Sequence, residues 1–270
     1  MNGLGLHVGK SGYIDYTPVA SDSNWWTGDG VNDYIQGDAT SPFIWSDLSS
    51  QDLSISMWVR IDSSSNKAQK LISFAETAGD NTNFISLSYL SSSKKLRYKI
   101  KTTGGTREGL VHISNSNNAI YTGLDNDGWV VSNRGATNPD GFCLITLTVD
   151  ISASGMNAFK WYWNGNPLTA GVSSSGSSIG TFEPAALGLG DNIHESVPTA
   201  GALGGALNEV KLYNRVLSSS EVVSIYNSGG AASASAVGVT SGLITEWRLN
   251  DDVTDSAGEY SSTNNGGVLN

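Results

Sequence analysis

The carboxylates that could break a glycosidic bond are dispersed along this chain. Retaining hydrolysis of such a bond needs two carboxyl groups roughly 5 Å apart. Because side chains alternate along a strand, a Glu-x-Asp-x-Glu or Glu-x-Asp-x-x-Glu motif would supply that pair on one face. Neither motif occurs, so we expect that the protein is not an enzyme. The glutamates are isolated from one another, at Glu76, Glu108, Glu183, Glu195, Glu209, Glu221, Glu246 and Glu259.

The histidines and the single cysteine show no spacing typical of a metal site or a catalytic triad. Cys143 lies in an apolar run, where a small buried side chain is expected, and one cysteine forms no intrachain disulfide. The glycines lack the lysine and helix of a phosphate-binding loop. The histidines are His7, His112 and His194.

A partial calcium-loop pattern is present at Asp125-Asn126-Asp127-Gly128. It supplies two carboxylates and a turn glycine, but it lacks the distant glutamate that completes such loops. A polar hairpin turn explains the same residues. We therefore expect no cofactor, with Ca²⁺ at this turn as the alternative.

Aromatic and loop residues are candidates for holding a sugar. Trp58 faces away from the apolar side chains of the run 53–59, which predicts an exposed aromatic on a concave surface or against a partner. Aspartate and asparagine in loops usually form turns, although they can also bind. The candidate carbohydrate-binding residues are Trp58, Asp125, Asp127, Trp129, Asp191 and Asn192.

The strand predicted over 96–101 carries apolar side chains on one face and cations on the other. One interpretation is a solvated face whose lysines discourage pairing at a sheet edge. The other is a charge-complementary contact with an acidic neighbouring subunit. The cations that would form this assembly contact are Arg97, Lys99 and Lys101.

The composition excludes several kinds of partner. The 270 residues carry 25 acidic against 15 basic side chains, a formal charge of −10. A field of that sign argues against nucleic acid or an anionic membrane as a partner. No apolar run reaches the roughly 18 residues of a membrane span. The start, Met1–His7, has no secretory signal pattern, so we expect action inside the cell or release by lysis.

Short strands dominate the pattern of the chain. Glycine, serine, asparagine and aspartate fill the gaps, so turns are frequent and helix is scarce. This predicts an all-β protein. Alternation and apolar runs place strands at 53–59, 84–90, 96–101, 142–149, 159–163, 186–189 and 207–212.

One short helix is predicted near 219–227. Ser218 and Glu221 have the spacing of a capping box, an apolar stripe follows, and Gly229 can take the left-handed stop. Residues 228–242 are almost entirely Gly, Ala and Ser and are expected to form a flexible linker. A structured segment is expected to resume at Leu243.

The stretch Leu207–Gly229 resembles the closing signature of laminin-G-like, concanavalin A-like jelly-roll domains, in which a strand of the type I-D-E-V-R-I-Y precedes N-R-x-L-S-x-x-E and a short helix. Segments at 26–35, 54–59, 142–150 and 161–165 resemble earlier parts of the same family in order. The resemblance implies a two-sheet antiparallel sandwich with the loop at 190–192 on its rim, where some members bind calcium or sugar. Relatives carry aspartate where this chain has Asn208, which argues against a metal there.

The tail at 243–270 resembles the opening strand of that family, although here it comes last. Its W-R-L and D-x-x-G motifs are also similar to the tails of structural proteins of tailed marine phages. We expect it to dock into its own sandwich or into a neighbouring subunit. The tail residues expected to act in assembly are Trp247, Arg248 and Leu249.

These observations predict four segments: an N-terminal arm (1–22), a jelly-roll sandwich (23–227), the linker (228–242) and a C-terminal docking strand (243–270). The function predicted first is a non-enzymatic virion subunit of a tailed phage, such as a capsid decoration, head-fibre or tail-associated protein. Its partners would be other virion proteins and further copies of itself. The alternative is an extracellular, lectin-like module that binds a glycan, with or without calcium.

Overall fold

In the computed structural model, the described residues are 25–37, 51–61, 68–113, 121–124, 130–132, 142–153, 155–168, 172–176, 183–191, 193, 201–228, 238–249, 252–254 and 262–269. The arm predicted over 1–22, most of the linker and the glycine at 229 lie outside these residues. No helix in the described part is long and apolar enough to cross a bilayer.

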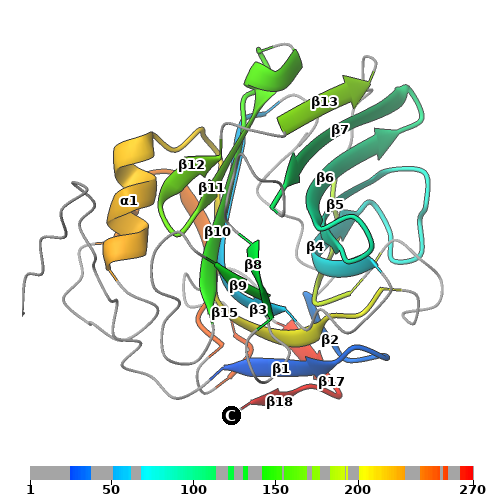
Figure 1. The fold of residues 1–270 in the computed structure, drawn as a ribbon. Helices are drawn as coiled ribbons and strands as arrows, with labels where there is room; N and C mark the ends of the chain where they lie inside the picture. The colour runs from blue at the N-terminus through cyan, green and yellow to red at the C-terminus, as the bar shows by residue number, and fades with distance from the viewer. Residues whose placement is uncertain are drawn as a thin grey trace, which may run out of the picture.

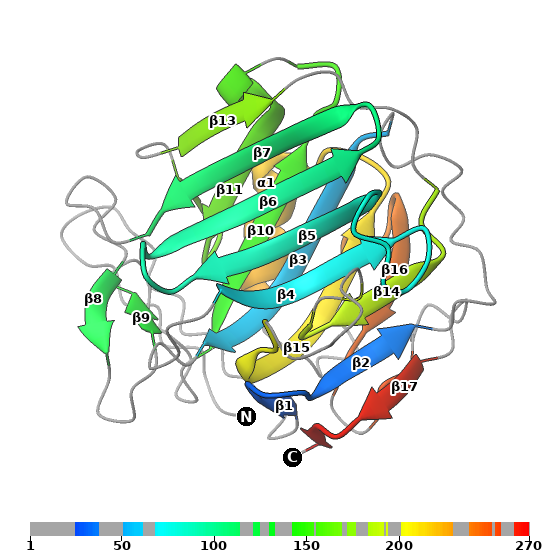
Figure 2. The same cartoon turned by 90° about the vertical axis from the view of Figure 1, so that its right-hand side faces the viewer.

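Two eight-stranded antiparallel sheets face each other (Figures 1 and 2). The first sheet runs β12-β11-β10-β3-β15-β1-β18, with β16 also paired to β15. Its strands are β12 (Asn166–Leu168), β11 (Phe159–Trp163), β10 (Cys143–Val149), β3 (Leu53–Ile61), β15 (Gly204–Tyr213), β1 (Trp26–Asp29), β18 (Val268–Leu269) and β16 (Leu243–Trp247).

The second sheet runs β13-β7-β6-β5-β4-β14-β2-β17 and is seen face-on in Figure 2. The strands β8 (Tyr121–Leu124) and β9 (Val130–Ser132) form a separate hairpin. A 3₁₀ turn, η1, spans Gly155–Ala158, and one α-helix, α1, spans Ser219–Asn227. The strands of the second sheet are β13 (Val172–Gly176), β7 (Gly105–His112), β6 (Lys95–Thr102), β5 (Phe84–Leu90), β4 (Ala68–Ala75), β14 (Ala186–Leu189), β2 (Tyr34–Gly37) and β17 (Ser262–Asn265).

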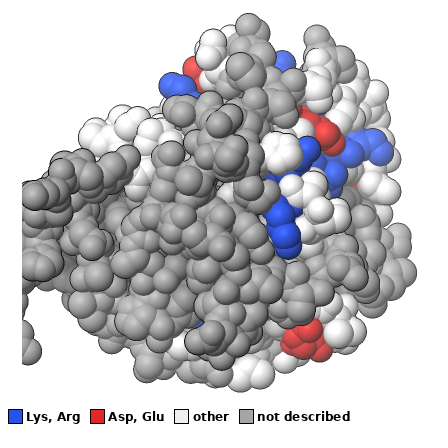
Figure 3. Space-filling view, in the orientation of Figure 1, with Lys and Arg blue, Asp and Glu red and all other residues white. Residues whose placement is uncertain are grey.

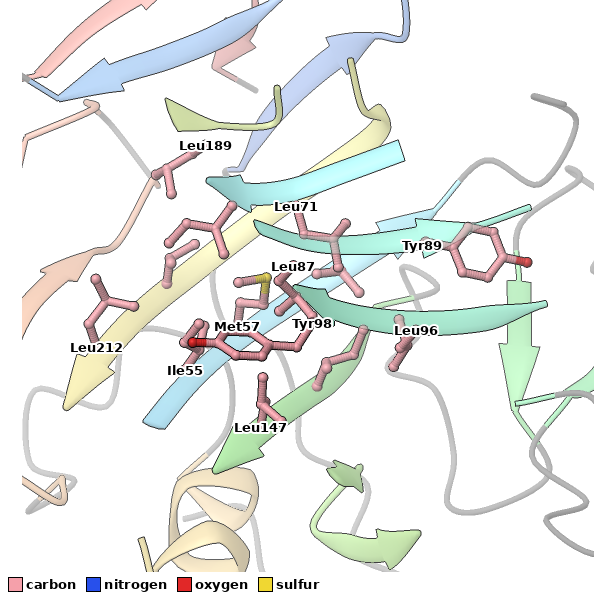
Figure 4. Packing of buried hydrophobic residues seen from close by; sticks show 14 of the residues in the cluster. Ile55, Met57, Leu71, Leu87, Tyr89, Leu96, Tyr98, Leu147, Leu189 and Leu212 are labelled. Carbon is pink, nitrogen blue, oxygen red and sulfur yellow. The ribbon is translucent and has the colours of Figure 1, made fainter. Parts of the chain in front are cut away.

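The core lies between the two sheets, and strand alternation fills it from both sides (Figure 4). Ile55 and Met57 of β3 face Leu87 of β5 and Tyr98 of β6 across the sandwich. Burial raises the pKa of the Tyr98 hydroxyl well above its ordinary value. The all-β, two-sheet prediction is confirmed, as are the strands predicted at 53–59, 84–90 and 96–101.

The prediction that β3 has one buried face and an exposed Trp58 is wrong. Helix α1 covers the outer face of the first sheet, and Trp58 is only 2% exposed. Its ring stacks on Tyr226 of α1 with a centroid distance of 5.8 Å. Leu144 and Tyr162 complete the same apolar cluster. Trp58 therefore offers no surface on which a sugar could stack.

Helix α1 begins with the predicted capping box. Ser218 Oγ accepts from the Glu221 backbone N–H, and Glu221 accepts in return from the Ser218 N–H at 2.8 Å. Arg215 donates two hydrogen bonds to the same carboxylate, of 2.6 and 2.9 Å. Hydrogen bonding from Arg215, with help from Ser218, lowers the pKa of Glu221 to about 2. The helix start is thus fixed to the end of β15.

The last three strands complete the chain's own sandwich. Strand β16 pairs with β15, β18 with β1, and β17 with β2. Trp247 and Leu249 are fully buried in the main core. The Trp247 indole donates to Ser262 Oγ at 2.9 Å, which joins β16 to β17. Of the two docking modes expected for the tail, the structure has the one within the same chain.

Replacing Glu221 by Gln is expected to remove about 1 kcal/mol of stability at neutral pH, since both the cap and the Arg215 pair are weakened. The folded pKa of Glu221, about 2, lies below its ordinary value of 4.5, so the carboxylate stabilises above pH 4.5 and this contribution fades as the pH falls toward 2. The melting temperatures of E221Q and wild type should therefore converge between pH 5 and pH 2. S224A, on the exposed side of α1, should show no such convergence, and a gap for E221Q that persists at low pH would refute the assignment.

Replacing Trp247 by Ala is expected to cost about 3–5 kcal/mol, because it opens a cavity in the main core. Urea unfolding followed by far-UV circular dichroism measures this cost. Val268 of β18 is 58% exposed and provides the control, since V268A should change the unfolding free energy by less than about 0.5 kcal/mol. Equal stability of the two variants would mean that the tail is not part of this core.

Candidate functional site

The outer face of the second sheet, which points away from the core, is polar at its centre. Strand β6 alternates strictly between buried and partly exposed residues, so Arg97 and Lys99 point outward while Tyr98 points into the core. Lys99 lies opposite Ser86 of β5 on one side and Glu108 of β7 on the other. Directly paired residues share a face of the sheet. A polar row therefore crosses three strands.

A second row lies one step along the same strands. Arg97 of β6 is paired with Ser88 of β5, and Ser88 with Lys70 of β4. Ser86 and Ser88 are fully buried, and neither Oγ has a hydrogen-bond partner in the part of the chain that the structure describes. Buried hydroxyls are normally bonded, so two neighbouring exceptions on one strand call for an explanation.

The cations at one end of this face lie over an aromatic ring. The Nζ atoms of Lys99 and Lys101 are 5.8 and 5.9 Å from the centroid of Phe84. Lys99 also pairs with Glu108 at 3.4 Å, and Lys101 donates to the Asn81 carbonyl at 2.8 Å. Figure 3 shows blue lysine and arginine atoms gathered beside red acidic atoms on the side of the molecule formed by the second sheet. Phe84, Ser86, Ser88, Arg97, Lys99 and Glu108 are called the outer polar site below.

The sequence predicted that the cations of β6 share a face, but not which residues of the neighbouring strands lie beside them. Edge protection is the wrong explanation for them, because β6 is an interior strand paired on both sides, with β5 and β7. The pattern of one strand could not show that serines lie beside the cations, since this requires the register of the β5–β6 pairing. Arg97, Lys99 and Lys101 do lie together on one face.

The turn after β14 folds over the adjoining part of the same face. Ser73 Oγ donates to the Asp191 carbonyl at 2.6 Å and accepts from the Ile193 N–H at 2.9 Å. Ile193 packs with Phe84 and two alanines in a small apolar cluster. The side chain of Asp191, one of the candidate carbohydrate-binding residues, is only 1% exposed, and its role in binding stays a prediction.

The other predicted site residues are placed as follows. Asp125, Asp127, Trp129 and Asn192 lie outside the described residues, so the calcium alternative at 125–128 stays a prediction. Among the described residues, no group of three or more His, Cys, Asp or Glu side chains could hold a metal ion. In the tail, Trp247 and Leu249 belong to the core, whereas the Arg248 side chain is 59% exposed.

Strand pairing brings together two glutamates that the sequence separates. Glu209 of β15 and Glu246 of β16 both contact Lys211 Nζ, at 3.2 and 3.1 Å. Burial alone would lower the pKa of Lys211, but the two carboxylates outweigh it and raise that pKa. Lys211 therefore stays charged between them. This arrangement is an ion triad that ties β16 to β15, not an open pair of carboxylates.

Comparisons with known proteins agree with this architecture. Residues 29–223 match the family model described as the concanavalin A-like lectin/glucanases superfamily. Among solved structures, a Bacteroides ovatus protein to which carbohydrate binding is ascribed superposes with a TM-score of 0.50 at 15% identity, over 92% of this chain. This chain spans only 60% of the length of that protein. No curated protein matches the chain in sequence.

Two further structures are similar at lower scores. The heptameric SAP-like pentraxin of Limulus polyphemus has a TM-score of 0.45 and 11% identity, over 91% of this chain and 93% of its own. The CBM40 of the Ruminococcus gnavus IT-sialidase, bound to α2,6-sialyllactose, has a TM-score of 0.44 and 16% identity, over 73% and 98%.

Replacing Lys211 by Met is expected to cost about 3 kcal/mol, because it leaves the buried Glu209 and the largely buried Glu246 without their cation. The triple variant K211M/E209Q/E246Q should recover most of that loss, which urea unfolding at pH 7 measures. K160M removes an exposed lysine of β11 and should be nearly neutral. If the triple variant were as unstable as K211M, the triad would not be held by charge.

Proposed function

We propose that this chain, which belongs to the concanavalin A-like lectin/glucanase superfamily, is a lectin-like domain that binds carbohydrate on the outer face of its second sheet. The observation that carries the proposal is the outer polar site, a row of donors and acceptors beside an aromatic ring. Jelly-roll sandwiches serve in lectins and in viral capsids alike, so the fold alone does not choose between these roles. The site does.

The outer polar site has the chemistry that a sugar needs. Sugar hydroxyls both donate and accept hydrogen bonds, and Lys99 beside Glu108 offers a donor and an acceptor side by side. Their side chains are 27% and 25% exposed, so a ligand can reach them. Phe84 is only 4% exposed, so its ring supports the two lysines from below and offers no stacking surface of its own.

Binding without bond cleavage is the simplest function of this arrangement. Glu108 is engaged by Lys99 and has no second carboxylate beside it on the described strands. Glu209 and Glu246 are the glutamates that strand pairing brings together, and Lys211 neutralises both. Two free carboxyl groups with separate acid and base roles are what glycoside hydrolysis requires. We therefore propose that the domain binds sugar without cleaving it.

The virion role predicted from the sequence has less support. It rested mainly on the likeness of the tail to those of tailed-phage structural proteins, with docking into a neighbouring subunit as one of two options. Strands β16, β17 and β18 pair with this chain's own sandwich. The family and the structural neighbour from Bacteroides ovatus concern carbohydrate. Assembly into a particle stays an untested prediction, and an extracellular place of action fits the glycan-binding proposal.

A glycan array probed with the full chain, with Ca²⁺ and with EDTA, tests the proposal. We expect a defined subset of glycans to bind equally in both buffers, since the one carboxylate of the outer polar site, Glu108, is paired with Lys99. Lys99→Met should weaken that binding about tenfold through loss of a charged donor, whereas K160M on the first sheet should bind as wild type. Absence of any bound glycan, or equal binding by K99M with its melting temperature unchanged, would contradict the proposal.

A further inference from the structure

We propose that the outer polar site recognises an acidic sugar, and that it holds the negatively charged group of that sugar between Arg97 and Ser88. This inference rests on the proposed function and adds the class of ligand to it. Four features of the described residues support it: the Arg97 guanidinium without an ion-pair partner, the two serine hydroxyls without hydrogen-bond partners, the strand register that sets them side by side, and the local positive charge.

Arg97 is the cation of the site for which the described residues supply no partner. Lys99 is paired with Glu108, and Lys101 donates to the Asn81 carbonyl. The Nε of Arg97 is buried and has no acceptor, and the guanidinium forms no ion pair with any described residue. An arginine presents a planar set of donors that matches the two oxygens of a carboxylate or of a sulfate ester. An oxyanion of a bound ligand would therefore supply the acceptor that the buried Nε–H of Arg97 lacks.

The neighbouring hydroxyls are unpartnered in the same place. Ser88 lies directly opposite Arg97, and Ser86 lies opposite Lys99 one step along the strand. Opposed residues place their Cβ atoms roughly 5 Å apart on one face, so one oxyanion between them can accept from both side chains. Leaving a buried hydroxyl without a partner destabilises the folded protein. The two serines thus lower the stability of the free protein, and a bound oxyanion would remove that loss by accepting their hydrogen bonds.

The charge of this face differs from that of the whole chain. The protein has a formal charge of −10, yet the outward positions of β6 are Lys95, Arg97, Lys99 and Lys101. Lys70 lies on the other side of Ser88, where it is buried and has contacts of its own. Glu108 offsets one of these charges through Lys99. The net local charge is positive, which favours anionic over neutral ligands.

The test uses pairs of glycans that differ only in one acidic group. Suitable probes are 3′-sialyllactose with lactose, oligogalacturonate with its methyl ester, and a sulfated disaccharide with its unsulfated form. We expect the wild-type chain to prefer the acidic member of at least one pair by about tenfold or more. Preference confined to the sulfated pair would identify a sulfate ester, and preference for either of the other pairs a carboxylate. Equal binding of both members in every pair would overturn the inference but leave the proposed function standing.

Three variants then locate the contact. R97M should abolish the preference for the acidic member, R97K should restore it in part, and K95M, which removes the same charge from the same face of β6, should keep it. S88A should weaken acidic ligands at least fivefold while its melting temperature stays equal to wild type or rises, because an unpartnered buried hydroxyl has been removed. A purely structural Ser88 would instead lower the melting temperature and leave the preference unchanged. An R97M variant that still prefers acidic glycans would also contradict the assignment.

Discussion

One strand has to satisfy the hydrogen bonds of three others, and the closure of the sandwich depends on it. Strand β15 pairs with β3 along one edge, while its other edge is shared by β1 at residues 204–207 and by β16 at residues 210–213. The change of partner coincides with a bulge at which Glu209 has a φ of +45°. A left-handed backbone at a residue other than glycine costs about 1–2 kcal/mol. The Glu209 N–H bond to the Arg248 carbonyl and the ion triad around Lys211 offset that cost.

The strands attached to β15 also join the two sheets. Trp26 of β1 is fully buried, and its indole donates to Asn264 of β17 in the second sheet at 3.0 Å. Asn264 in turn donates to the Gly267 carbonyl at 2.7 Å. A Cβ at Gly267 would collide with the indole, and one at Gly190 would lie 2.7 Å from it, so both positions need glycine. The first and last described strands therefore close the same end of the sandwich around one side chain.

The sequence predicted those features that depend on neighbours along the chain. Alternation located β3, β5 and β6, and the Ser218–Glu221 spacing located the start of α1. It failed where distant segments meet. Trp58 was assigned to a surface because α1, which buries it, lies some 160 residues later in the chain. Glu209 and Glu246 looked isolated because only the β15–β16 pairing brings them to one lysine. Ser86 and Ser88 could not be predicted as site residues, since only the register of the β5–β6 pairing places them beside Lys99 and Arg97.

The two outer faces of the sandwich differ in what covers them, and this difference leads to the site. On the first sheet, Trp58, Leu144 and Tyr162 point outward and need an apolar cover, which α1 provides with Val222, Ile225 and Tyr226. The outer face of the first sheet is therefore buried beneath α1 and forms a second apolar core. On the second sheet, the outward residues of β5 and β6 other than Phe84 are mainly serines and cations, which an apolar helix could not cover without leaving their donors unbonded. Donors without protein partners are stable in such a place only when solvent or a ligand accepts from them. The same alternation that builds one core between the sheets thus places polar side chains at outward positions of β5 and β6. The proposed ligand would supply an acceptor to those that have no partner among the described residues.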